Sequence, residues 1–452
     1  LWSSHSRSRR SRGSVCGRLP RSRSCGRPHR LLCRPHQQRH RQHGRTSFQS
    51  TDTFAQENKS ANDKLGVGCI GLGGRGSGIA RQALKLGTPI IACDVDQNRA
   101  DGFAKGSGNN CPAVQDYRHV LDNKDVDVVT IGTPDHWHSK IAIDAMRAGK
   151  DVYCEKPLTL TVDEGIKICD AVKETGKVFQ VGTQQRSEYG GSFLKAVAIC
   201  HLGWLGDNLQ ALSSVGTAQR GGPFKTSEPP ANLDWNMWQG QTAETDYIKE
   251  RTHYQFRWWL EYSGGQVTDW GVHHTDIAMW ALGLHETGPT SIEGVGAFDT
   301  RPNCYNVAHT FDTMMKFKNG SSINLTSGKN ELIIEGTKGK LRVNRGGITG
   351  KIVDDINADK SLQEQLNAKI EEVYRGKVTP HMVNFFNCVK SRDLPISDVF
   401  THHRSVSVCH LANIAMQLGR KLDFDPDKQQ FKSDDEANGM LSRKQRAGFE
   451  IS

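Results

Sequence analysis

Residues 65–76, LGVGCIGLGGRG, decide the fold of this chain. The first half is a run of small and β-branched apolar residues, which is typical of a buried parallel strand. The second half places Gly71, Gly73 and Gly76 in the order G-x-G-x-x-G, and apolar residues at helical spacing follow it. The glycine pattern alone also fits a flexible loop, but a strand, a glycine turn and a helix in succession indicate dinucleotide binding. The residues expected at the pyrophosphate are Gly71, Gly73, Gly74, Arg75 and Gly76.

A second buried strand ends in an acidic residue and supports this interpretation. The segment TPIIACDVD, residues 88–96, contains Asp94, which lies 18 residues beyond Gly76. This is close to the separation expected for the carboxylate that binds the adenosine ribose hydroxyls. A carboxylate there repels a 2′-phosphate, so NAD(H) is favoured over NADP(H), although Arg99 nearby keeps NADP(H) open. A simpler alternative is that Asp94 only ends the strand in a turn.

The charge of the chain is concentrated in its first residues. The 452 residues are enough for two or three domains. Residues 1–50 contain 13 Arg and no Lys, Asp or Glu, so the net charge of +10 leaves −3 for the other 402 residues. Residues 1–62 show almost no apolar periodicity, which predicts a disordered basic tail. The tail lacks interleaved aromatic residues and no run reaches roughly 20 apolar residues, so neither nucleic acid nor a membrane is an expected partner.

Two explanations for the sequence of this tail are considered. Arg9-Arg10 is similar to a twin-Arg export signal, yet the apolar region of such a leader is missing. A wrongly assigned start or reading frame fits the unusual composition better, and we favour it. The default compartment is therefore the bacterial cytoplasm, with the periplasm as the alternative if the natural N-terminus carries a twin-Arg leader.

The chain after the tail alternates strands and helices, which implies a doubly wound parallel sheet. Strands are expected at 65–70, 90–94, 126–131, 151–154 and 177–181, and helices at 75–86, 97–105, 138–148 and 163–175. Residues 290–345 show the alternation of an antiparallel sheet, and helices follow at 354–372, 380–390 and 401–418. The 12 Cys are scattered without metal-ligand spacing, so neither a metal site nor a disulfide scaffold is expected.

Two of the expected strands end in polar residues, and loops after the carboxyl ends of parallel strands form the ligand crevice. In VVTIGTPDHWH, residues 128–138, we expect Thr133, Pro134 and especially His138 near the nicotinamide or ribose. The alternative is that Pro134 and the following acid only cap the next helix.

In DVYCEKP, residues 151–157, Glu155 and Lys156 are expected at the cofactor. Lys156 can donate to a substrate oxygen, and a cis bond at Pro157 would aim it inward. Alone, the tripeptide Glu155-Lys156-Pro157 also fits a common surface turn.

A later motif places Asp269, His273 and Asp276 at i, i+4 and i+7 of a predicted helix, hence on one face. Asp269 is expected to orient His273, which exchanges a proton with the substrate, while Asp276 is assigned to substrate binding. An isolated pair of this kind is more often a surface salt bridge. The remaining substrate residues are expected to be Gln184 and Arg186, on a loop that crosses to the next domain, and Trp238 in the aromatic segment 216–262. Taken singly, each aromatic residue also fits loop packing.

The segments GLGGRG, CDVD, TPDHWH, AGKDVYCEKPL and GG-x3-D-x3-H-x2-D together resemble the Gfo/Idh/MocA oxidoreductases, which include glucose–fructose oxidoreductase and inositol dehydrogenases. The sequence around these motifs is similar to that of a branch of the family that is common in environmental bacteria and whose substrates are mostly unassigned. The resemblance implies an NAD-binding Rossmann domain over 63–182 and an α+β domain with a large, mostly antiparallel open sheet over 183–378. It also implies C-terminal helices over 379–452 that pack back on the Rossmann domain, and a homo-dimer or homo-tetramer. In this family the residue matching Lys156 lies at the nicotinamide and the one matching His273 is the usual acid/base.

The expected activity is NAD(H)-dependent hydride transfer between nicotinamide and a hydroxyl or carbonyl carbon of a sugar, cyclitol or derivative. An alternative is an NAD-dependent glycoside hydrolase that works by oxidation and elimination, as the α-N-acetylgalactosaminidases of the superfamily do. The lysine after Glu155 favours the dehydrogenase. A third interpretation, a binding protein without chemistry, is disfavoured by the presence of Lys156, Asp269 and His273 together.

Overall fold

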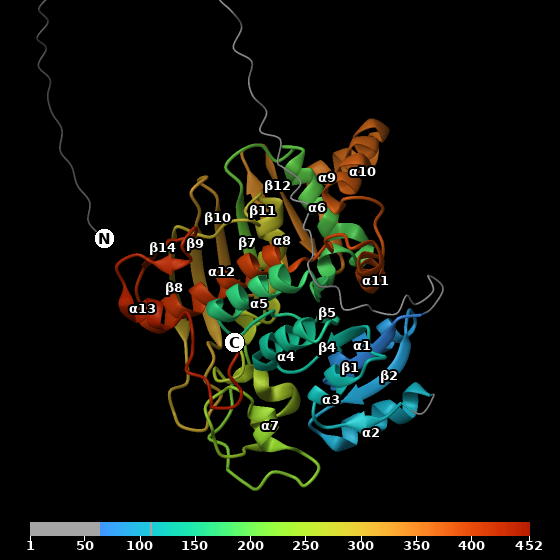
Figure 1. Cartoon of the computed structure of the whole chain (residues 1–452). Coiled ribbons are helices and arrows are strands. Elements are labelled where there is room, and N and C mark those ends of the chain that lie inside the picture. Colours follow the sequence, from blue (N-terminus) through green and yellow to red (C-terminus); the bar gives the residue numbers. More distant parts are fainter. Residues whose placement is uncertain (1–63, 109–110) are drawn as a thin grey trace, which may run out of the picture. The chain divides into compact units, whose positions relative to one another are not determined.

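The computed structural model describes residues 64–108 and 111–452. The tail predicted over residues 1–62, with its leader or start-site interpretation, lies outside the described residues. Two sheets with helices packed against them organise the described part (Figure 1). Within these ranges, no helix is both long and apolar enough to cross a lipid bilayer.

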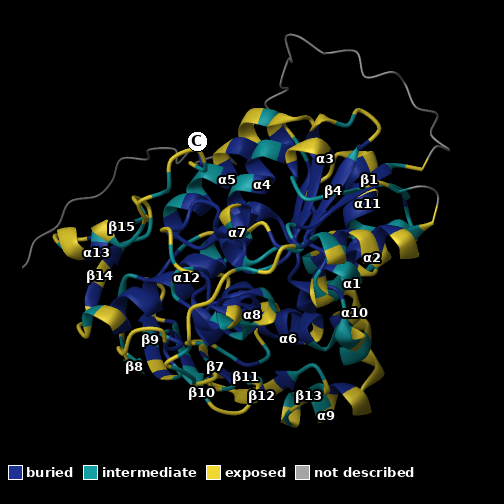
Figure 2. Cartoon of the chain, turned by 90° about the horizontal axis from the view of Figure 1, so that it is seen from below, coloured by how far each residue is buried: buried dark blue, intermediate teal, exposed yellow. Residues whose placement is uncertain are grey.

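The first sheet has six parallel strands in the order β3-β2-β1-β4-β5-β6. Its strands are β1 Gly66–Ile70, β2 Thr88–Cys93, β3 Ala113–Val114, β4 Val128–Ile131, β5 Asp151–Cys154 and β6 Phe179–Val181. The predicted doubly wound Rossmann sheet is confirmed. β1 and β4 lie side by side and are buried (Figure 2), and between them the direction of winding reverses, which is where such sheets bind ligands.

Crossover helices cover both faces of this sheet. They are α1 Gly74–Leu84, α2 Gln97–Ser107, α3 Arg118–Asp122, α4 Asp135–Arg147 and α5 Val162–Thr175. Local sequence sets their ends: the Thr161 side chain accepts a hydrogen bond from the Glu164 amide at the start of α5, and Gly176 ends it in the left-handed conformation. The predicted start of α4 at residue 138 is wrong, because Pro134 is already its N-cap.

The second sheet has nine strands in the order β13-β12-β11-β7-β10-β9-β8-β14-β15. Their bounds are β7 Gln210–Val215, β8 Ser291–Ala297, β9 Thr310–Lys316, β10 Ser322–Ser327, β11 Glu331–Gly336, β12 Gly339–Asn344, β13 Gly347–Thr349, β14 Leu422–Asp425 and β15 Gln430–Phe431. Only β7 and β10 pair in parallel, so the large, mostly antiparallel sheet is confirmed. Phe311 and Met315 are buried on one face of β9, whereas Asp312 is exposed on the other.

The remaining helices follow the first sheet in the chain. They are α6 Ser192–His201, α7 Trp235–Gln239, α8 Trp270–Ala281, α9 Lys351–Ala358, α10 Lys360–Tyr374, α11 His381–Ser391, α12 Val399–Leu418 and α13 Asp435–Gly439, with 3-10 turns at Gln184–Arg186, Tyr189–Gly191, Lys249–Arg251, His253–Trp258 and Gly265–Val267. The one helix predicted over 354–372 is two, because Asp359 caps a new start by accepting from the amides of Ser361 and Leu362.

The chain beyond residue 379 packs against the first sheet and adds two strands to the second. Phe385 of α11 shares a buried core with Val67 of β1 and Ile79 of α1. α12 packs against α5, α8 and β8, and Leu422 of β14 pairs with Ile292 of β8. The domain boundaries at residues 182 and 378 stay a prediction.

Candidate active site

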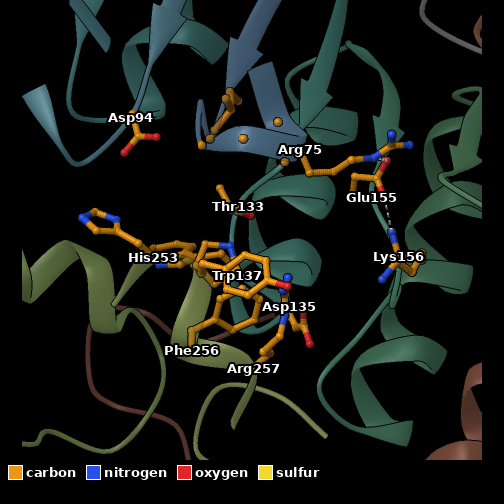
Figure 3. Close-up of a pocket in the computed structure, with 18 of the residues that line it drawn as sticks. Arg75, Asp94, Thr133, Asp135, Trp137, Glu155, Lys156, His253, Phe256 and Arg257 are labelled. Carbon is orange, nitrogen blue, oxygen red and sulfur yellow. Dashed lines mark hydrogen bonds and ion pairs between the residues drawn. The ribbon is translucent and has the colours of Figure 1, made fainter. Parts of the chain in front are cut away.

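A cavity of about 510 Å³ lies at the carboxyl ends of β1, β2, β4 and β5, where segments from the second part of the chain face the Rossmann sheet (Figure 3). Most residues predicted for the site line it. They are Gly71, Gly73, Gly74, Arg75, Gly76, Asp94, Thr133, Pro134, Glu155, Lys156, Gln184, Trp238, Asp269 and His273. Asp94 lies at one end of the cavity and Lys156 at the other (Figure 3).

In the glycine turn, at the Asp94 end of the cavity, Gly71 and Gly76 leave no room for a side chain. Gly71 has a φ of +77°, and a Cβ there would lie 2.5 Å from the amide nitrogen of Thr133. A Cβ on Gly76 would lie 1.8 Å from the carbonyl oxygen of Gly71, so helix α1 can approach β1 only without it. At Gly74 a Cβ would meet nothing within 4 Å, which leaves the first turn of α1 open to the cavity. This geometry fits a bound pyrophosphate.

Asp94 is fixed at the end of β2. Its Oδ2 accepts a hydrogen bond from the Leu72 amide at 2.7 Å, and its Oδ1 accepts one from the Asp96 amide at 2.9 Å. Burial raises the pKa of Asp94, although these two bonds oppose the shift. A carboxylate fixed in this way fits the ribose of a dinucleotide. Arg99 also lines this end, and its Nε lies 3.6 Å from Asp96 Oδ2.

Glu155 accepts hydrogen bonds from two other side chains that line the cavity. Its Oε1 accepts from Arg75 Nε at 2.8 Å and from Gln184 Nε2 at 3.0 Å (Figure 3 draws the first pair). Gly182 packs against it, since a Cβ there would lie 2.8 Å from the carboxyl carbon. Glu155 thus positions two predicted ligand-binding side chains.

Lys156 and Asp269 form an ion pair across the cavity. Lys156 Nζ donates to Asp269 Oδ1 and lies 3.4 Å from the Asp269 carbonyl oxygen. The Lys156–Pro157 bond is cis, as predicted. Arg257 Nε lies 3.5 Å from Asp269 Oδ2. Burial alone would raise the pKa of Asp269, but the charges of Lys156 and Arg257 bring it below its usual range, so the carboxylate stays ionised.

His273 lies one turn further along α8 and lines the same cavity. Burial, and next the charges of Lys156 and Arg345, hold its pKa well below the usual value, so the imidazole is neutral near pH 7. Its Nδ1 has no hydrogen-bond partner within the described residues. The prediction that Asp269 orients His273 is therefore not met: Asp269 pairs with Lys156 and Arg257 instead.

Three predicted ligand contacts lie outside the cavity, and the structure corrects them. His138 is buried in α4, with Nδ1 2.6 Å from the Pro157 carbonyl oxygen and Nε2 3.0 Å from that of Thr133. Arg186 and Asp276 form a buried bidentate pair with both bonds at 2.7 Å. Asp276 is fully buried in this pair and does not line the cavity.

Several residues that the sequence analysis did not assign to the site also line the cavity. Asp135 follows β4, accepts from Ser263 Oγ at 2.6 Å, and burial raises its pKa to about 7. Its position at the carboxyl end of a predicted strand is the signal in the sequence that marks it, and its place at the start of α4 agrees with the capping interpretation as well. Tyr189 and Arg345 also line the cavity, and nothing in their local sequence marked them. Of the aromatic segment, Trp259 and most other rings pack among themselves, as the simpler interpretation expected.

Family models match both parts of the chain. The model for the NAD-binding Rossmann fold of the Gfo/Idh/MocA oxidoreductases matches residues 65–183, and the model for the C-terminal alpha/beta domain matches residues 222–451. The second model alone covers 230 of the 452 residues. The Rossmann domain of this chain is therefore an NAD-binding domain.

Curated relatives match over shorter stretches. A glycosyl hydrolase family 109 protein of Shewanella pealeana is 36% identical over 157 residues, 32% of this chain and 34% of that protein. The inositol 2-dehydrogenase of Salmonella paratyphi B is 31% identical over 137 residues, 29% of this chain and 41% of that protein. The chain thus spans about a third of the length of the first curated relatives it matches.

Solved structures share the fold over most of the chain. The WlbA dehydrogenase of Bordetella pertussis, in complex with NADH and UDP-GlcNAcA, has a TM-score of 0.60 at 19% identity and covers 81% of this chain and 99% of that one. A levoglucosan dehydrogenase, in complex with NADH and levoglucosan, has a TM-score of 0.57 at 20% identity and covers 79% and 99%. With both family models matched in order and the glycine turn, Lys156 and His273 on one cavity, the chain belongs to the Gfo/Idh/MocA oxidoreductase family.

Proposed function

We propose that the protein is an NAD(H)-dependent dehydrogenase that acts on CH–OH groups of sugars or cyclitols. One observation carries this proposal: the Lys156–Asp269 pair and the neutral His273 line the same cavity as the glycine turn. The inositol 2-dehydrogenase match and the likeness to a levoglucosan dehydrogenase support the substrate class. Assembly into a homo-dimer or homo-tetramer remains part of the proposal.

Bound NAD would supply the hydride acceptor, held by the glycine turn, by Asp94 and by the residues that follow β4. At the reacting end, Lys156 Nζ donates a hydrogen bond to the substrate oxygen and stabilises negative charge that develops there. Asp269 holds the ammonium in place through one carboxylate oxygen, and Arg257 contacts the other oxygen of the same carboxylate. The neutral His273 takes up the hydroxyl proton at a ring nitrogen, and the reverse transfer serves reduction of a carbonyl.

The proposal is tested by incubating the purified full chain with NAD and a panel of sugars and inositols, following NADH by absorbance. We expect NADH formation with at least one member of the panel and none in its absence. Tight binding of NAD with no NADH formed from any of these alcohols would contradict the dehydrogenase assignment.

A second candidate is an NAD-dependent glycoside hydrolase. It is favoured by the matches to glycosyl hydrolase family 109 proteins and to the α-N-acetylgalactosaminidase of Shewanella oneidensis, which is 35% identical over 153 residues. Such an enzyme would release the aglycone from an aryl α-N-acetylgalactosaminide without net formation of NADH. A dehydrogenase would form NADH and leave that glycoside intact.

A further inference from the structure

More cationic side chains than carboxyl groups line the cavity, and not every cation has a carboxylate partner. Five Lys or Arg side chains and four carboxyl groups line it. One of the four, Asp135, has a pKa raised to about 7 by burial and is therefore only partly ionised at neutral pH. Four of the five cations nevertheless have a carboxylate partner: the pairs are Arg75 with Glu155, Lys156 and Arg257 with Asp269, and Arg99 with Asp96.

Arg345 is the exception. It lies in the turn between β12 and β13 and reaches the cavity from the second sheet. Among the described residues no carboxylate forms an ion pair with it, and its buried Nε has no hydrogen-bond partner. Its Cζ lies 4.6 Å from the ring centre of Tyr189 and 4.3 Å from that of Trp270. Stacking on two rings holds the guanidinium while leaving its in-plane N–H groups free to bind a ligand.

Arg345 also lies at the reacting end of the cavity. Trp270 directly follows Asp269 in the chain, and its ring centre lies 5.7 Å from that of His273. One indole ring therefore contacts both the unpaired guanidinium and the imidazole. Asp94, which marks the ribose position, lies at the other end of the cavity from Lys156, so the adenosine half of the cofactor is remote from Arg345 (Figure 3).

We propose that the substrate is an anionic sugar, carrying a carboxylate or a phosphate, and that Arg345 binds this group and determines specificity. The inference rests on the proposed function, since it uses the same cavity. A guanidinium forms two parallel hydrogen bonds with either group, which a neutral hydroxyl cannot reproduce. The charge of the bound anion would also offset those of Lys156 and Arg345, whose fields lower the pKa of His273, and so make the imidazole a stronger base.

The test is calorimetric titration of the NADH-loaded full chain with matched sugars: D-glucuronate and glucose 6-phosphate against D-glucose, and D-galacturonate against D-galactose. We expect at least one acidic sugar to bind about tenfold or more tightly than its neutral counterpart. Arg345→Met should remove about 10- to 100-fold of that affinity, the range for hydrogen bonds to a charged group, without changing the affinity for neutral sugars or NADH. Arg345→Lys, which keeps the charge but not the planar fork, should fall between the two.

Arg342→Met is the matched control. Arg342 lies on β12, is exposed, pairs with Glu331 and does not line the cavity. Its variant should bind every probe as the wild type does. Comparing glucuronate with glucose 6-phosphate shows which anion the site accepts.

The proposal is overturned if acidic and neutral sugars bind alike, or if Arg345→Met weakens both equally or weakens NADH instead. In each of these cases, NADH formation from a neutral sugar would leave the proposed function standing. Conversely, Arg345-dependent binding of an acidic sugar with no redox reaction of any alcohol would overturn the function and leave the anion site.

Discussion

The imidazole of His273 is neutral near pH 7 and can accept a proton at the reacting end of the cavity. Lys156 is already an ammonium paired with Asp269, and Arg345 stays charged at any working pH. His273→Ala should therefore lower kcat by about 10²- to 10⁴-fold, the usual contribution of a positioned acid/base, while NAD binds with unchanged affinity. Steady-state kinetics and NAD titration measure the two effects. The exposed His119 of α3 offers the control, since His119→Ala should leave both values as they are.

Asp135 gives a prediction about pH. Its folded-state pKa of about 7 is above the usual 3.8 because burial disfavours the charged form. A raised pKa means that its stabilising contribution is present at low pH and is lost as pH rises toward 7, at about 1.4 kcal/mol per pH unit. Asp135→Asn keeps an acceptor for Ser263 but does not titrate. Relative to wild type, the variant should gain about 3 kcal/mol between pH 5 and 8 in urea unfolding. A constant difference across that range would show that Asp135 titrates normally.

Individual residues could be predicted from the sequence only where a motif fixes their surroundings. Gly71 and Lys156 follow predicted strands directly, so their place at the sheet's carboxyl edge was predictable. The hydrogen-bond partner of Asp269 was not predictable. Helical spacing places Asp269 one turn from His273, but the contact with Lys156, from a distant part of the chain, determines the hydrogen bonds of the carboxylate. Arg345 could not be predicted, because it reaches the cavity from a hairpin turn far along the chain and only the assembled fold brings it near Trp270.

At the level of elements, the buried pair of Arg186 and Asp276 joins the turn after β6 to α8. Both side chains are almost fully buried, and Ser405 of α12 donates a further bond to Asp276. The guanidinium holds the pKa of Asp276 below its usual range, although burial opposes this. Removing one partner leaves a buried charge, so Arg186→Met should lower the free energy of unfolding by about 3–5 kcal/mol. Urea unfolding measures it, and KM of the folded fraction should change little.

Arg147→Met is the comparison for this variant. Arg147 Nη2 lies 3.1 Å from Glu174 on the surface, where ion pairs contribute about 0–1 kcal/mol. If Arg186→Met proved as harmless to stability as Arg147→Met but raised KM strongly, the earlier assignment of Arg186 to the substrate would have to be restored.

Long periodic elements could be predicted and short ones could not. Most strands and helices of the Rossmann sheet agree with their patterns. The exceptions are the short elements β3 and α3, which no pattern predicted, and α4, which begins earlier than predicted. Similarly, β14 comes from the C-terminal segment, and only its pairing with β8 identifies it as part of the sheet. The early start of α4 at Asp135 explains why His138 faces the interior and not the ligand.

Several histidines in the described part of the chain are buried and neutral, which predicts the response of the molecule to acid. Burial lowers their pKa values: to about 3 for His136 and His410, and to about 4 for His274, His381 and His403. These side chains connect distant segments; His381 Nε2, for example, lies 2.9 Å from the Val181 carbonyl oxygen. On unfolding, each regains its usual pKa of 6.5, so below that pH the unfolded state binds protons that the folded state does not.

The sign of this effect is therefore a loss of stability as pH falls below 6.5, by up to about 1.4 kcal/mol per pH unit for each histidine. Asp135, whose pKa burial raises to about 7, acts in the opposite direction over the same range, but its contribution is smaller than the sum over five histidines. Urea midpoints measured at pH 7.5, 6.5 and 5.5 should thus fall slightly from the first to the second and markedly from the second to the third. A midpoint that stays level or rises at pH 5.5 would mean that the folded protein protonates these rings, and that the buried segments they connect open to water well before the chain unfolds.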